Sequence, residues 1–124
     1  MRVIHLLGTA QPDGMAVARI VHGLARHADR ERYRIEAWFM GGDGPLVDWL
    51  RSEGVCARSV ACGGVRRPVE LGRLWLALRH ASPRIVHQHV GGPAVRAVIR
   101  AASDARVVAH LHGRVAETGL VRPA

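Results

Sequence analysis

The feature that most constrains the fold is a regular alternation of short apolar runs with stretches of helical periodicity. Turns rich in glycine or proline separate them. Such alternation is typical of a parallel sheet with right-handed crossovers. We therefore predict a Rossmann-like three-layer α/β domain with strand order 3-2-1-4-5. The predicted strands are 2–7, 34–39, 55–61, 84–89 and 106–111, and the predicted helices are 15–28, 46–53, one between Pro68 and Pro83, and one marked by Val95, Val98, Ile99 and Ala102.

The same periodicity predicts which side chains are buried. The first helix carries an apolar stripe, which we expect to face the sheet: Val17, Val21, Leu24 and Ala28. Five residues separate Cys56 from Cys62, which is not a zinc-site spacing, and there is no second pair. We expect two free, buried thiols.

Length and charge limit the class of protein. A chain of 124 residues suits one domain, and it has no apolar run long enough to cross a bilayer. The net charge is +8 and every basic residue except histidine is an arginine. That charge suits an anionic partner, but the arginines are spread along the chain and aromatic residues make up only 4%. Nucleic acid is therefore not the favoured partner. We expect a cytoplasmic protein, with peripheral contact to the inner face of the membrane as an option.

Histidines and glycines gather where the predicted strands end. Ligands of doubly wound sheets bind beyond the carboxyl ends of the strands, near the switch in strand order. The loop 8–14, the stretch from His89 to Gly92 and the pair His112-Gly113 should meet there. The candidate substrate-binding residues are Asp13, Gly14, His89, Gly91, Gly92 and Gly113.

Three interpretations of the histidines stay open. They are metal ligands, hydrogen-bonded core residues (above all His87 and His110), or groups that bind sugar hydroxyls or phosphates (above all His89 and His112). We expect no metal site, because no carboxylate or cysteine is tied to these histidines by spacing. Other chemistry is poorly supported, since the sequence has neither lysine nor a G-x-S-x-G turn.

Several stretches together resemble one family. They are RVIHLL with a loop ending in PDG, the helix VARIVHGLARHA, FMGGDGPLVDWLRSEGV, SPRIVHQH and RVVAHLHG. In this order they are similar to the N-terminal, acceptor-side domain of a GT-B glycosyltransferase of the family-four type. The sequence departs from the family at Arg84, where an aspartate is usual, and at Gly14, where a double glycine is common.

The resemblance implies a retaining glycosyltransferase that moves a sugar from a nucleotide-sugar donor to an acceptor bound at this domain. It implies a domain at 1–113, followed by a tail at 114–124 that starts a truncated segment. The catalytic residue would be His112, near the reacting sugar, and Gly14 would lie near the donor phosphates. The resemblance implies no cofactor and no metal. The donor-binding domain would be a separate partner, so we expect residues 1–124 alone to be inactive.

Two other functions remain as alternatives to the transferase. One is a non-catalytic α/β module that binds a phosphate or a nucleotide. The other is a basic domain that interacts with nucleic acid.

Overall fold

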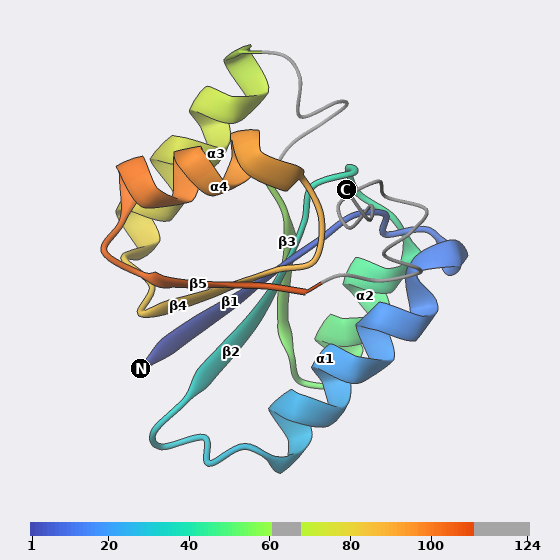
Figure 1. The fold of residues 1–124 in the computed structure, drawn as a ribbon. Coiled ribbons are helices and arrows are strands. Elements are labelled where there is room, and N and C mark those ends of the chain that lie inside the picture. The colour runs from blue at the N-terminus through green and yellow to red at the C-terminus, as the bar shows by residue number, and fades with distance from the viewer. Residues whose placement is uncertain (61–67, 111–124) are drawn as a thin grey trace, which may run out of the picture.

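The computed structural model describes residues 1–60 and 68–110. Its five strands form one parallel sheet in the order β3-β2-β1-β4-β5, which confirms the predicted topology (Figure 1). The strands are β1 (Arg2–Leu7), β2 (Arg34–Phe39), β3 (Cys56–Ser59), β4 (Ile85–Gln88) and β5 (Arg106–Ala109). The helices are η1, a single 3₁₀ turn (Pro12–Gly14), α1 (Met15–His27), α2 (Pro45–Ser52), α3 (Pro68–Ala81) and α4 (Gly92–Ala102).

One face of the sheet packs against α3 and α4 (Figure 1). Alternate residues of the central strands point to this side, because successive side chains of a strand face opposite ways. Ile4 and Leu6 of β1 are fully buried here. They pack in one cluster with buried residues of the neighbouring strands and the two helices, among them Trp38, Val86, Leu74, Leu78, Val95 and Ile99.

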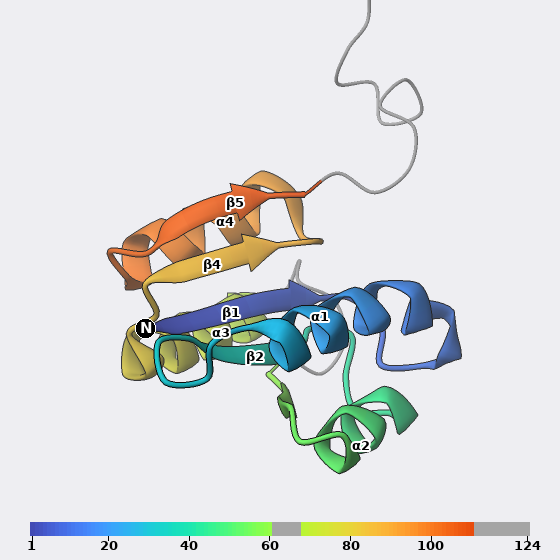
Figure 2. The same cartoon turned by 90° about the horizontal axis from the view of Figure 1, so that it is seen from below.

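The opposite face packs against α1 and α2, but only over part of the sheet. Leu7 and Phe39 are buried on this side with residues of the two helices, among them Ala18, Val21, Leu46, Val47 and Leu50. Figure 2 shows α1 crossing in front of β1 and β2, whereas no described element lies in front of β4 and β5. Val108 of β5 is accordingly 47% exposed. His87, on β4, lies on this half of the sheet, and His89 and His110 directly follow β4 and β5.

Two burial predictions are wrong. Leu24 is 46% exposed, because α1 is rotated so that the small residues Ala18 and Ala25 pack with Val21 toward the sheet. Cys56 is exposed, because it opens an edge strand in which the next residue, Ala57, points into the core. Cys62 lies outside the described residues.

Element boundaries agree closely with prediction. Strand β2 and the start of α3 at Pro68 are as predicted, while β3, β4 and β5 are shorter than the predicted runs. Residues 111–113 and the predicted tail 114–124 lie outside the described residues, so the predicted domain boundary stays a prediction. Within the two described ranges, no helix has both the length and the apolar character needed to cross a membrane.

Candidate functional site

A pocket of about 420 Å³ lies at the carboxyl ends of β1 and β4. The first βα loop and the start of α1 form one wall, and the residues that follow β4 and β5 form the other. This is the edge where doubly wound sheets bind ligands. The lining residues are Leu7, Gly8, Thr9, Asp13, Gly14, Val17, His89, Val90 and His110.

Close backbone contacts fix the first loop. A Cβ atom on Gly14 would lie 2.4 Å from the carbonyl oxygen of Thr9. A Cβ on Gly41 would lie 2.8 Å from the carbonyl oxygen of Gly8. The backbone N–H of Gly41 donates to that same oxygen at 2.8 Å. The glycines therefore let two loops pack backbone to backbone, which positions the pocket wall.

Four histidines form a continuous cluster beside this pocket. His5 of β1 is in register with His87 of β4, and His89 lies two residues further along on the same face. The Nδ1 atom of His5 is 3.1 Å from Nε2 of His89. The Nε2 atom of His87 is 3.2 Å from Nδ1 of His110. The rings of His87 and His89 stack, with centroids 4.2 Å apart.

The four histidines of the cluster differ in how deeply they are buried. His5 and His89 are buried, His87 is half-buried and His110 is exposed. Burial, with a smaller contribution from the nearby His87, lowers the pKa of His5 to about 4. His5 is therefore neutral at pH 7, with one ring nitrogen carrying a lone pair. Within the described residues, His5, His87 and His89 each offer a ring nitrogen, all within 4.8 Å of one another.

The pocket gathers three of the six predicted substrate-binding residues, namely Asp13, Gly14 and His89. Gly91 and Gly92 are not among its lining residues. Gly91 has φ +99° before α4, and a Cβ there would lie 2.4 Å from Val95. These two glycines shape the turn between β4 and α4. The remaining candidates, His112 and Gly113, lie outside the described residues.

Sequence reasoning missed His5. It lies within an apolar run, so only the register between β1 and β4 brings it opposite His87. That register brings ring nitrogens of His5, His87 and His89 within 4.8 Å of one another. Finally, His110 is exposed and hydrogen-bonds to His87, so it is not a core residue.

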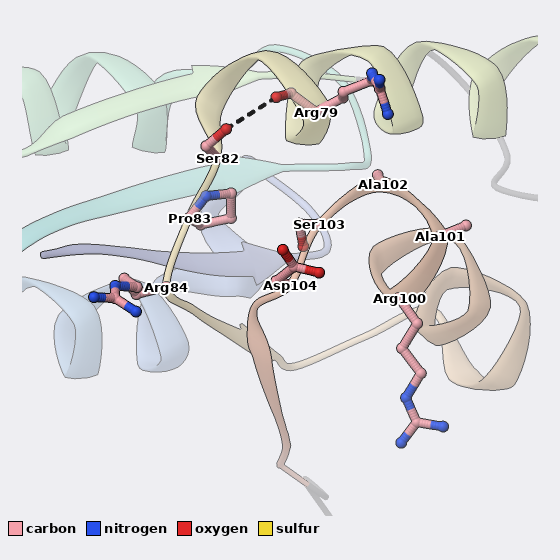
Figure 3. A pocket seen from close by; sticks show the side chains of 9 residues that line it. All are labelled: Arg79, Ser82, Pro83, Arg84, Arg100, Ala101, Ala102, Ser103 and Asp104. Atoms are coloured by element: carbon pink, nitrogen blue, oxygen red, sulfur yellow. Dashed lines mark hydrogen bonds between the residues drawn. The ribbon is translucent and has the colours of Figure 1, made fainter.

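A second cavity, of about 570 Å³, lies at the opposite edge of the sheet, beyond the amino ends of β4 and β5 (Figure 3). It holds three arginines, but Figure 3 shows Arg79, Arg84 and Arg100 pointing away from one another. Arg79 and Arg100 belong to the last turns of α3 and α4, where the helix dipole disfavours anions. The cavity therefore lacks a convergent site, and we place the candidate site at the carboxyl edge.

Comparison with solved structures shows the fold. A glycosyltransferase from Rickettsia africae superposes over 87% of this chain with a TM-score of 0.66 and 14% identity. MurG from Acinetobacter baumannii superposes over 96% with a TM-score of 0.61 and 12% identity. This chain spans only 28% and 38% of those two proteins.

The same fold also occurs outside glycosyltransferases. The C-terminal domain of a hydrogenase from Pyrococcus furiosus superposes over 88% of this chain with a TM-score of 0.54 and 12% identity. No protein-family model and no curated protein matches the sequence. At these identities the likenesses show a Rossmann-like fold of the kind found in glycosyltransferase domains, and function must be argued from the site.

Proposed function

We propose that this chain is the acceptor-side half of a glycosyltransferase, which transfers a sugar from a nucleotide-sugar donor to an acceptor held in the carboxyl-edge pocket. Two of the structural neighbours support it, the glycosyltransferase of Rickettsia and MurG. The resemblance of the sequence motifs to family-four enzymes points the same way. The donor would bind a second domain, and transfer would occur with retention of configuration.

The observation that carries this proposal is the mixed chemistry of the pocket lining. The Asp13 carboxylate accepts hydrogen bonds, and the imidazoles of His89 and His110 both donate and accept. Apolar side chains, Leu7 and Val17, form the rest of the wall. Sugars present hydroxyl groups around their rim and C–H groups on their faces, so they match such a lining. A phosphate matches the apolar part of this lining less well, because it has no C–H faces.

The rim of the pocket suits the donor diphosphate. Helix α1 begins after Gly14, which makes no side-chain cap hydrogen bond, although the N–H of Met15 already donates to the carbonyl of Pro12. The first backbone N–H groups of a helix, together with the helix dipole, favour an anion. We propose that the sugar acceptor fills the pocket while the donor diphosphate approaches Gly14 at its rim.

The proposed catalytic residue is His112, which would donate a hydrogen bond to the transferring sugar as charge develops at its anomeric carbon. In a chain that also carries the donor-binding half, His112→Ala should lower turnover about a hundredfold, on the order of 3 kcal/mol, without lowering the melting temperature. A mutant with near-normal turnover, or one that unfolds, would contradict the assignment. Residues 1–124 alone should transfer no sugar, so turnover by the purified chain would contradict the two-domain division.

The proposal also includes the partners and the place of action. The acceptor would be a sugar, a lipid or a glycan, and no metal would take part in the transfer itself. The enzyme would act in the cytoplasm. The net charge of +8 would hold it against anionic lipid headgroups at the inner face of the membrane.

Nuclear magnetic resonance titration of the ¹⁵N-labelled chain tests the pocket. We expect methyl glycosides of hexoses and N-acetylhexosamines to shift the amide signals of Gly8, Thr9 and Gly14. Val17→Trp fills the pocket and should abolish these shifts, whereas Leu24→Trp, on an exposed position of the same helix, should preserve them. Shifts caused by a nucleoside diphosphate but by no glycoside would replace the proposal with the phosphate-binding alternative.

A further inference from the structure

We propose that His5, His87 and His89 bind one divalent transition-metal ion of the zinc class. The three residues come from two neighbouring strands that are hydrogen-bonded in register, so the backbone fixes where the side chains begin. His87 and His89 alternate onto the same face of β4, and His5 faces them from β1. An H-x-H pair on one strand and a facing histidine on the next supply three imidazoles on a rigid scaffold.

The separations match one ion. Zn²⁺ binds imidazole nitrogens at about 2.0–2.1 Å, so two ligands at a tetrahedral angle lie roughly 3.4 Å apart. The Nδ1 atom of His5 and the Nε2 atom of His89 are already 3.1 Å apart. The three ligand atoms all lie within 4.8 Å of one another, and ring shifts of about 1 Å bring them within reach of a single ion. His87 is half-buried.

The hydrogen bond between two of the proposed ligands marks a place for the ion. A metal ion binds the lone pair of a ring nitrogen in place of a proton. Where the His5 and His89 nitrogens now share one hydrogen bond, the ion would replace the proton between them.

A fourth histidine lies next to the three proposed ligands. His110 is exposed, and its Nδ1 atom is 3.2 Å from Nε2 of His87. His110 and Asp13 line the same pocket as His89, so the ion would lie at the wall of that pocket. Three imidazoles form a recognised zinc donor set, and imidazole also suits Ni²⁺ and Cu²⁺. The ion would join β1 to β4. The zinc proposal does not depend on the proposed sugar transfer, although His89 and His110 also line the pocket proposed for the acceptor.

Zinc titration of the tag-free chain 1–124 tests the site. A polyhistidine tag must be absent, because it binds the same ions. We expect isothermal calorimetry to give one Zn²⁺ per chain, with a Kd of about 10 μM or tighter. His87→Ala should weaken binding at least about a hundredfold, because loss of even an outer partner of a metal site costs about 10- to 100-fold. His5→Gln should do the same.

Two control variants make the result specific. His27→Ala and His80→Ala each remove an exposed histidine that is not part of the cluster, and both should leave the Kd unchanged. Zinc should also raise the melting temperature of the wild-type chain but not of His87→Ala, which separates loss of binding from loss of folding. Absence of one-to-one binding tighter than about 100 μM would overturn the proposal. Equal weakening by His87→Ala and His27→Ala would overturn it as well.

Discussion

Replacing Gly14 with alanine tests whether backbone packing fixes the pocket wall. The added Cβ atom would lie 2.4 Å from the carbonyl oxygen of Thr9, roughly 1 Å inside an ordinary C···O contact of about 3.3 Å. The oxygen belongs to backbone and cannot rotate away. The loop 8–14 would have to move, and with it the hydrogen bond from the N–H of Leu46 to the carbonyl of Ala10, now 2.9 Å long.

Two opposed effects determine how much Gly14→Ala changes the free energy of unfolding. Forcing an extra carbon into a tightly packed site costs about 1–3 kcal/mol. Gly14 has φ −87° and ψ 5°, which alanine adopts, so the smaller entropy of the unfolded chain offsets about 0.4–1 kcal/mol of that cost. The net loss of unfolding free energy should be about 1–2 kcal/mol, or roughly 5 °C in melting temperature.

Urea unfolding followed by circular dichroism measures this loss, with Gly23→Ala as the matched control. Gly23 lies in the same region of the chain, within α1, and a Cβ there meets no atom within 4 Å. Alanine at that position should stabilise the protein by about 0.5–1 kcal/mol. The two identical substitutions should therefore shift the midpoint in opposite directions with the same m-value. A Gly14→Ala midpoint at or above that of the wild type would refute the reasoning.

Three further predictions concern burial and charge. Burial lowers the pKa of His5 from 6.5 to about 4. Between pH 6.5 and pH 4, His5 therefore binds a proton in the unfolded chain but not in the folded protein. In EDTA, stability should therefore fall by roughly 3 kcal/mol between pH 6.5 and pH 4, and His5→Gln should lack that part of the loss; equal pH slopes would contradict this. Leu24→Gln should change the unfolding free energy by less than about 0.5 kcal/mol, because Leu24 is half-exposed; a loss above about 1 kcal/mol would mean that the leucine is buried. Glu36→Ala should cost about 2–3 kcal/mol in thermal unfolding, because buried Glu36 accepts hydrogen bonds from Arg2 and from Trp38 Nε1, the latter at 3.2 Å; an unchanged transition would show that water replaces the carboxylate.

The order of the elements could be predicted from the sequence because it depends on alternation, which survives small errors in boundaries. The helix faces were harder. In α1 the helical periodicity is consistent with two buried faces, one that includes Leu24 and one that includes Ala18 and Ala25. Close packing of the small residues against the sheet selects the second face. That packing depends on the sheet and cannot be predicted from the sequence of α1 alone.

Part of the candidate site could be predicted, because the order of the elements indicates which loops meet at the carboxyl edge of the sheet. Asp13, Gly14 and His89 follow from the rule that ligands bind at the carboxyl edge of a parallel sheet. His5 does not, because its place depends on register. A slip of one residue between β1 and β4 would turn His5 to the opposite face and separate it from His87.

The contact between His5 and His89 joins positions 84 residues apart, which bears on how the molecule folds. Closing a loop of that length costs about 4 kcal/mol of chain entropy, so this contact forms late unless other contacts shorten the loop first. Strands β1, β2 and β3 with their two helices are contiguous in sequence and do not need β4 to pair. His5 gains its neighbours His87 and His89 only when β4 adds to β1. The nuclear magnetic resonance signal of the His5 imidazole should therefore report that step.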